Sequence, residues 1–267
     1  MRHRRKKEPA RAGSAARQRA PAIGFDLGET LWHYIRWPLG AVEAWKPVLG
    51  AVAEAASLGD RADVDAAAQV ATDLEMQTRG GLEEINTQDA FGAMLHALGG
   101  DAGRHVETAV DTFFHFFRQD LELYPGAVET LAELKRRGFK VGALTNVPYG
   151  MPRATIQADL ERTGLAPHVD ALVTSADVGL RKPHSATYEW LAAGLGVATN
   201  EIIYVGNHAT DVQGALAVGA TPVFVDRDQT GDDHGQAATI TSLGELLDLV
   251  ELAPQGAGSD PLATPPR

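Results

Sequence analysis

The stretch AIGFDLGETL, residues 22–31, places a carboxylate directly after four consecutive apolar or small residues. A short apolar run of this kind is typical of a buried strand. The run ends at Asp26, so the side chain of Asp26 is expected at the carboxyl end of that strand. The stretch therefore predicts a short buried strand over 22–25 that delivers an acidic group to one edge of a sheet.

The sequence after Tyr124-Pro125-Gly126 alternates between strand-like and helix-like segments. Gly138 is a suitable residue to end the first of the helices. Apolar runs predict strands at 140–144, 171–174, 202–205 and 222–225, and helical spacing of apolar residues predicts helices at 127–137, 152–163, 185–195, 211–218 and 242–252. Such alternation with short links predicts an α/β fold with a doubly wound, Rossmann-like parallel sheet.

The region between the first strand and this alternating part is helical in character. Apolar residues at spacings of three and four predict helices at 41–57, 62–78, 89–98 and 105–121. We therefore expect an inserted α-helical domain over 37–119 and a core made of residues 21–36 and 120–252. The aromatic residues within 32–37 are expected to line the junction of the two, and the phenylalanines within 113–117 to form the core of the insert.

The charge of the chain is unevenly distributed. The net charge is −11, yet the first 20 residues hold eight of the 24 lysines and arginines and one of the 35 acidic residues. We expect this basic segment, 1–20, and the Pro/Gly/Ala-rich segment 253–267 to be disordered tails. The rest of the chain is strongly acidic and repels a phosphate backbone, so we expect no nucleic-acid partner.

The composition excludes several classes of protein. The chain has no cysteine, which excludes a disulfide scaffold, a thiol nucleophile and a thiolate zinc site. No stretch approaches the roughly 18 apolar residues of a membrane span, and the basic N-terminus is not followed by the apolar region of a secretory signal. We expect a cytoplasmic protein without a membrane partner, and the oligomeric state is left open.

Polar residues follow four of the predicted strands. They are Asp26 with Gly28, Thr145 with Asn146, the loop 175–182, and the segment 207–211. Ligands of parallel α/β sheets bind at the carboxyl ends of the strands, so these residues are expected to converge. Two carboxylates, a hydroxyl, an amide and a lysine are typical of a small anionic site with room for a hard cation.

Four motifs stand in order at these strand ends and resemble those of the haloacid dehalogenase-like (HAD) hydrolase superfamily, which consists mostly of phosphatases. They are FDLGETL at 25–31, LTN at 144–146, GLRKP at 179–183 and VGNHATD at 205–211. The resemblance covers about residues 22–31 and 120–252 and implies that the helical insert is the cap of that superfamily. It also implies an Mg²⁺-dependent phosphatase that acts on a small phosphorylated metabolite.

The resemblance assigns a role to each residue of the expected site. Asp26 would be the nucleophile that forms an aspartyl-phosphate, with Thr145 and Lys182 completing the catalytic set. A carboxylate reaches a phosphate dianion only where a cation and hydrogen-bond donors offset the repulsion. The implied substrate-binding residues are Thr145, Asn146 and Lys182. The implied Mg²⁺ ligands are Asp26, the carbonyl of Gly28, Asn207 and Asp211.

Two positions depart from the family pattern. Gly28 stands where phosphatases of the family usually carry a second Asp, and general acid–base help of that kind contributes about 10²–10⁴-fold in rate. Asn207 replaces the first acid of the last motif and removes one negative charge from the metal site. Glu29 is an alternative acid. Three functions stay open: a phosphatase, a weakly active or inactive phosphate-binding protein, and a dehalogenase-type hydrolase that uses Asp26 at carbon.

Each of these residues also has a purely structural interpretation. Asp26 is compatible with a turn at the end of a strand, and Asn207 with a satisfied loop amide. Thr145 and Asp211 are compatible with helix N-caps, and Lys182 with a solvated loop lysine. We favour the functional interpretation because the four motifs occur together, in order, each at the end of a predicted strand.

Overall fold

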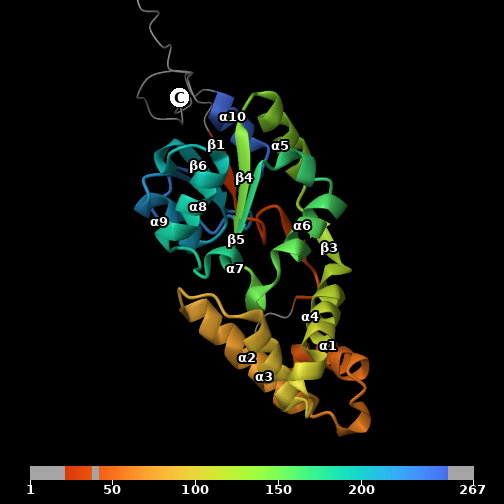
Figure 1. Ribbon diagram of the computed structural model, residues 1–267. Helices are drawn as coiled ribbons and strands as arrows, with labels where there is room; N and C mark the ends of the chain where they lie inside the picture. Colours follow the sequence, from red (N-terminus) through yellow and green to blue (C-terminus); the bar gives the residue numbers. More distant parts are fainter. Residues whose placement is uncertain (1–21, 38–41, 252–267) are drawn as a thin grey trace, which may run out of the picture.

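The computed structural model describes residues 22–37 and 42–251. The tails expected at 1–20 and 253–267 lie outside the described residues. In Figure 1 a sheet with its covering helices occupies the upper part of the molecule, and the helices of the insert lie below it. The functional residues predicted from the sequence all fall in the described part.

Six parallel strands form the central sheet in the order β5-β4-β1-β6-β7-β8. Strand β1 lies inside the sheet, between β4 and β6. The strands are β1 (Ala22–Phe25), β4 (Lys140–Thr145), β5 (Ala171–Thr174), β6 (Ile202–Gly206), β7 (Thr221–Val225) and β8 (Ala238–Ile240). The predicted α/β fold with a doubly wound parallel sheet is confirmed, and the carboxyl ends of β1, β4 and β6 meet at one edge.

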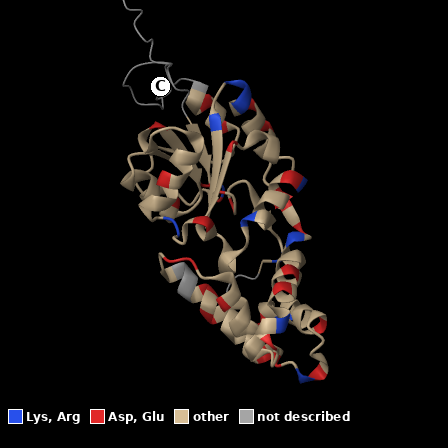
Figure 2. Cartoon of the chain, in the orientation of Figure 1, with Lys and Arg blue, Asp and Glu red and all other residues tan. Residues whose placement is uncertain are grey.

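Successive strand residues face opposite layers of helices. Ile23 and Phe25 belong to one buried cluster, whereas Ala22 belongs to a second. Gly24 faces the second layer, where a Cβ would lie 2.8 Å from the side chains of Leu191 and Tyr204. The first cluster includes residues of α5 (Ala127–Arg136), α6 (Arg153–Arg162) and α10 (Glu245–Glu251), and the second includes residues of α8 (Ser185–Leu195) and α9 (Ala209–Ala217). Charged residues lie mainly on helices and loops, and the strands of the sheet contain almost none of them (Figure 2).

In the described part of the chain, four α-helices lie between β2 (Trp32–Tyr34) and β3 (Leu121–Leu123) and pack against one another. They are α1 (Val42–Ala55), α2 (Val64–Gly80), α3 (Thr87–Ala97) and α4 (Ala102–Arg118). Asp63, Asn86 and Asp101 cap α2, α3 and α4 by accepting hydrogen bonds from backbone N–H groups of the first turn. Phe113 and Phe117 are fully buried in the interior of the insert, as predicted. The insert boundaries at 37 and 119 stay a prediction.

A two-stranded antiparallel ribbon joins the insert to the core. Strand β2 (Trp32–Tyr34) pairs with β3 (Leu121–Leu123), and Tyr34 lies opposite Leu121. The helix predicted over 105–121 is therefore wrong at its end, because α4 stops at Arg118 and Leu121 is extended. The cause is a long-range one: the backbone of Leu121–Leu123 is paired with a strand nearly 90 residues earlier in the chain.

Several short elements add to the predicted set. Strand β8, helix α7 (Ser175–Val178) and turns of 3-10 helix at 59–61, 148–150, 166–168 and 199–201 complete the described structure. Within the described residues, the helices are all too short or too polar to cross a membrane.

Candidate active site

Lys182 bridges two carboxylates at the carboxyl edge of the sheet. Its Nζ atom lies 2.6 Å from Oδ1 of Asp26 and 2.7 Å from Oδ1 of Asp211. The three side chains are at most 10% exposed. Lys182 also donates to the hydroxyl of Tyr204 (3.2 Å) and, more distantly, to the carbonyl of Leu144 (3.3 Å). The structure thus brings together three of the residues predicted for the site, from β1, the loop before α8, and α9.

The charges of this cluster are strongly coupled. Burial raises the pKa of Asp26 to about 6, against the opposing effect of the Lys182 ammonium, and the negative charge of Asp211 adds to the rise. Burial acts to lower the pKa of Lys182, but the carboxylates of Asp211 and Asp26 outweigh it and raise that pKa. One ammonium therefore faces two buried carboxylates, and the cluster favours the approach of further positive charge.

Asn207 and Asp211 are held beside Asp26 by hydrogen bonds. The buried Thr30 hydroxyl lies 2.9 Å from Oδ1 of Asn207, to which it donates, and 3.4 Å from Oδ2 of Asp26. The second oxygen of Asp211 accepts a hydrogen bond from the backbone N–H of His208 at 3.0 Å, which is an N-terminal capping interaction of α9. Asp211 therefore combines its predicted capping role with its place in the charged cluster.

Thr145 is the last residue of β4, one residue beyond the predicted strand, and Asn146 follows it. The amide of Asn146 bonds twice to the backbone of Lys182, accepting from its N–H at 2.8 Å and donating to its carbonyl at 3.2 Å. Asn146 thus positions Lys182, and its expected contact with substrate stays a prediction. Thr145 is 5% exposed, and both residues line the cavity described below.

Gly28 and Glu29 form the turn after Asp26. A Cβ at Gly28 would meet no atom within 4 Å, and its φ lies outside the left-handed region. Glu29 has a φ of 56°, and its carboxylate accepts a hydrogen bond of 2.5 Å from the hydroxyl of Tyr124. The space beside Asp26 at position 28 is open, and the neighbouring carboxylate is already engaged.

Arg227 is a residue of the site that the sequence analysis missed. Its guanidinium donates to the carbonyls of Glu29 (2.6 Å) and Thr30 (2.5 Å) and lies 3.6 Å from the centre of the Tyr124 ring. These contacts fix the turn that follows Asp26. The signal was present in the sequence, because Arg227 follows a strand, β7, at the same edge of the sheet.

The insert touches the core next to Lys182. Glu84, in the loop between α2 and α3, accepts hydrogen bonds from Arg181 (2.5 Å) and from the hydroxyl of Ser175. The backbones also pair: the N–H of Glu84 donates to the carbonyl of Gly179 at 3.0 Å, and the N–H of Arg181 donates to that of Leu82 at 2.7 Å. The side chains of Arg181 and Glu84 are only 11% and 2% exposed, so the junction is a buried ion pair.

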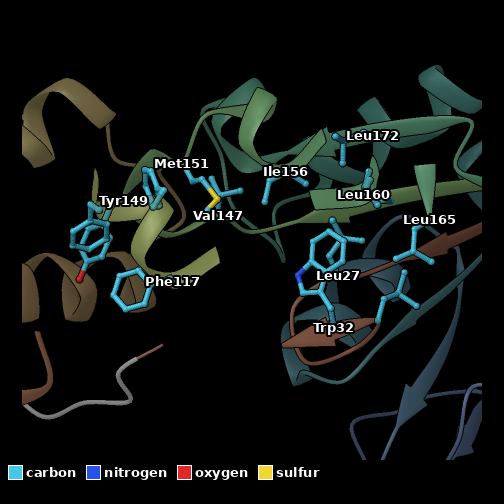
Figure 3. Packing of buried hydrophobic residues seen from close by; sticks show 14 of the residues in the cluster. Leu27, Trp32, Phe117, Val147, Tyr149, Met151, Ile156, Leu160, Leu165 and Leu172 are labelled. Atoms are coloured by element: carbon cyan, nitrogen blue, oxygen red, sulfur yellow. The ribbon is translucent and has the colours of Figure 1, made fainter. Parts of the chain in front are cut away.

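A cavity of about 810 Å³ opens between the charged cluster and the insert. Asp26, Thr145, Lys182 and Asp211 belong to its lining. The apolar residues of the lining, called the apolar wall below, are Trp32, Ile35, Trp37, Val147, Tyr149, Met151 and Ile156. The lining also includes the polar residues His33, Glu75, Arg181, His208 and Thr210. Figure 3 labels Trp32, Val147, Tyr149, Met151 and Ile156 in a buried cluster that includes residues of both the insert and the core.

Comparison with known proteins gives the family of the chain. A model of the haloacid dehalogenase-like hydrolase family matches residues 20–219. The chain is 36% identical over 152 residues to ribulose-1,5-bisphosphate 5-phosphatase of Halopiger xanaduensis, over 52% of this chain and 62% of that protein. It is 31% identical over 173 residues to the (S)-2-haloacid dehalogenase of a Pseudomonas strain, over 62% of this chain and 70% of that protein.

The alignments with the first four curated relatives span between 56% and 64% of their lengths. A solved HAD phosphatase of Thermococcus onnurineus has the same fold, with a TM-score of 0.59 and 23% identity over 85% of this chain and 96% of that one. Phosphatases and dehalogenases both occur among the relatives. The family match covers most of the chain and agrees with the motifs at the strand ends, and the chain belongs to the haloacid dehalogenase-like hydrolases.

Proposed function

We propose that the chain is a phosphatase that hydrolyses a small phosphorylated metabolite through an aspartyl-phosphate on Asp26. The observation that carries the proposal is the buried carboxylate of Asp26 at the end of the inner strand β1, paired with Lys182 and facing a large cavity. The phosphatases among the relatives support it.

The chemistry has two displacement steps. An oxygen of Asp26 forms a bond to phosphorus while the bond between phosphorus and the ester oxygen breaks, and the leaving group takes the electron pair. Water then attacks the phosphorus, restores the Asp26 carboxylate and releases inorganic phosphate. The ammonium of Lys182 and the hydroxyl of Thr145 would stabilise the charge on the phosphoryl oxygens. Asn146 would keep Lys182 in place through its two backbone hydrogen bonds.

The donor set around Asp26 fits a hard divalent cation. Asp26 and Asp211 offer carboxylate oxygens, Asn207 an amide oxygen and Gly28 a carbonyl, and Mg²⁺ prefers oxygen ligands. Bound there, Mg²⁺ would supply positive charge between the nucleophile and the phosphate. Among the described residues no group of three or more His, Cys, Asp and Glu is arranged to hold a metal, so the expected affinity without substrate is low.

A second candidate is displacement at carbon by Asp26, as in a dehalogenase. Two observations favour it: the apolar wall of the cavity that Asp26 also lines, and the neutral residues Gly28 and Asn207, which a reaction without metal tolerates. The same neutral residues are compatible with a weakly active or inactive phosphate-binding protein.

Product release separates these possibilities. Purified protein is incubated with a panel of phosphate monoesters and with 2-haloacids, with and without Mg²⁺, and phosphate and halide are measured. We expect Mg²⁺-dependent phosphate release that Asp26→Asn abolishes. Halide release without metal would favour the dehalogenase, and no product of either kind would favour the binding protein. The cytoplasmic location and the absence of nucleic-acid and membrane partners stay predictions from the sequence.

A further inference from the structure

The cavity is large for a small phosphorylated metabolite. Its volume of about 810 Å³ lies near the upper end of the roughly 300–1,000 Å³ of pockets that hold drug-sized ligands. The charged cluster that would bind the phosphoryl group supplies only part of its lining. The remaining space is available to the part of the substrate that leaves.

The apolar wall has few polar groups to offer to that part. Trp32, Val147, Tyr149, Met151 and Ile156 line the cavity with aromatic or aliphatic side chains that are at most 4% exposed, and Figure 3 shows them packed among buried hydrophobic residues. Ile35, at the end of the ribbon, is 53% exposed and presents a further aliphatic side chain. Transfer of an apolar group from water to such a wall is favourable in proportion to the area that is buried.

Three polar side chains near the wall already have protein partners, whereas the buried Nδ1 of His33, which also lines the cavity, has none among the described residues. The hydroxyl of Tyr34 donates to Asp159 at 2.7 Å, and that of Tyr149 donates to the carbonyl of Ala71 at 2.8 Å. The guanidinium of Arg181 bonds to Glu84 and to the carbonyl of Val147. At Tyr34, Tyr149 and Arg181 a hydroxyl of the leaving group would therefore lose its water without gaining an equivalent hydrogen bond, which is costly.

The turn after Asp26 offers no free acidic side chain to protonate the leaving oxygen. Position 28 has no side chain, and the carboxylate of Glu29 is bonded to Tyr124 at 2.5 Å. An alkoxide has a basicity close to that of hydroxide, since the pKa of bulk water is about 15.7, and it leaves slowly without a proton donor. A phenolate, with a pKa of about 10, departs as the anion.

We propose that this cavity takes phosphate monoesters of aromatic alcohols, a substrate class that rests on the phosphatase function proposed above. The phosphoryl group lies at Asp26 and Lys182, and the aromatic body lies against the apolar wall. In the first step the bond between Asp26 and phosphorus forms, the aryl oxygen leaves with its electron pair, and it takes a proton from water. In the second step water releases phosphate from Asp26, and one proton goes to solvent.

The first test compares four monoesters in the presence of Mg²⁺: 2-naphthyl, phenyl and cyclohexyl phosphate, and glucose 6-phosphate. We expect kcat/KM for the two aryl phosphates to exceed that for glucose 6-phosphate by about 10²-fold or more. Cyclohexyl phosphate, which has an apolar body but an alkoxide leaving group, is expected to bind well and react slowly. Glucose 6-phosphate turned over as well as phenyl phosphate would overturn the substrate class and leave the phosphatase intact. No phosphate from any ester would overturn the phosphatase, and this inference with it.

Binding without turnover gives a second readout. Phenylphosphonate and methylphosphonate, which are not hydrolysed, are compared as competitive inhibitors. We expect phenylphosphonate to bind about tenfold more tightly or better, since it buries an aromatic ring. Equal inhibition constants would mean that the wall does not contact the leaving group and would contradict the proposal.

A pair of matched variants locates the aromatic body. Ile35 (53% exposed) lines the cavity, whereas Leu216 (47% exposed) lies on α9 away from its lining. We expect Ile35→Asn to raise KM for 2-naphthyl phosphate several-fold and to leave the inhibition constant of inorganic phosphate unchanged. Leu216→Asn should change neither. An unchanged KM in Ile35→Asn would overturn the placement of the substrate against the wall.

Discussion

The Nζ atom of Lys182 lies 2.6 Å from Oδ1 of Asp26 in a salt bridge whose side chains are at most 10% exposed. The two residues are 156 positions apart in the sequence, and the hydrogen bonds of Asn146 to the Lys182 backbone hold the lysine at this point. Asp211 lies on the other side of the same ammonium, at 2.7 Å. Lys182 therefore offsets part of the repulsion between two buried carboxylates.

Lys182→Met is expected to destabilise the fold as well as to reduce activity. Removal of one partner from a buried ion pair costs about 3–5 kcal/mol, because the remaining charges are left without compensation. The measurement is the free energy of unfolding in urea. Lys135→Met is the matched control, since Lys135 pairs with Asp170 at 2.5 Å but the side chains are 30% and 39% exposed. Lys135→Met is expected to lower the free energy of unfolding by no more than about 1 kcal/mol. An equal decrease in the two variants would contradict the stabilising role of the buried Lys182 ion pairs.

Gly28→Asp is expected to raise activity most for poor leaving groups. Position 28 has room for a side chain, since a Cβ there meets no atom within 4 Å. A carboxyl beside Asp26 would donate a proton to the leaving oxygen, a contribution of up to about 10²–10⁴-fold in rate. The measurement is kcat/KM for a series of esters graded by the pKa of the leaving group.

The result is the slope of log kcat/KM against the pKa of the leaving group. We expect wild-type rates to fall steeply as the leaving-group pKa rises, and Gly28→Asp to flatten the slope. A flat profile in the wild type, with fast release of alkyl alcohols, would mean that another residue such as Glu29 already donates the proton. Glu29→Gln would then lower the rate for alkyl phosphates.

Asn207→Asp is expected to tighten Mg²⁺ binding in calorimetry. The amide oxygen of Asn207 accepts a hydrogen bond from Thr30, and a carboxylate at this position keeps that acceptor while adding one negative charge. The control is Asn200→Asp, which adds the same charge at an exposed turn before β6. An affinity that is unchanged by Asn207→Asp, or changed equally by both variants, would remove position 207 from the metal site.

Glu84→Gln is expected to loosen the insert from the core. The Glu84 carboxylate is 2% exposed and pairs with Arg181, directly before Lys182 in the chain. Loss of the charge leaves the guanidinium of Arg181 buried without its counter-ion, so we expect faster amide hydrogen exchange at residues 82–84 and 179–181. Glu83→Gln, at the exposed neighbouring position, should leave the exchange as in the wild type. Similar protection in Glu84→Gln and Glu83→Gln would mean that backbone pairing alone holds the junction.

The elements with strong local patterns could be predicted from the sequence. The strand at 171–174 and the helix at 185–195 have the predicted bounds, because the apolar spacing and a glycine at the helix end specify them locally. The ribbon of β2 and β3 could not be predicted in the same way. Each of its strands has three residues, and the extended form of Leu121 depends on pairing with Tyr34, far away in the sequence.

The candidate site likewise has residues that could be predicted from the sequence and contacts that could not. Asp26, Lys182 and Asp211 could be predicted from their positions after strands, because the carboxyl ends of neighbouring parallel strands meet at one edge of the sheet. The sequence does not show that Asn146 bonds to the backbone of Lys182, or that the hydroxyl of Tyr204 in β6 accepts a hydrogen bond from the Lys182 ammonium. Both roles depend on three-dimensional contacts. Tyr204 has the pattern of an ordinary core residue in a buried strand, and nothing local distinguishes it.

The most direct measurement is single-turnover phosphate release from 2-naphthyl phosphate by the wild type and by Asp26→Asn, with mass spectrometry of the acid-quenched protein. We expect the wild type to release phosphate and to carry a transient mass increase of one phosphoryl group on the peptide that contains Asp26. We expect Asp26→Asn to stay folded, to show no such adduct and to release no phosphate above the uncatalysed rate. Phosphate release by Asp26→Asn at the wild-type rate would contradict the assignment of Asp26 as the nucleophile.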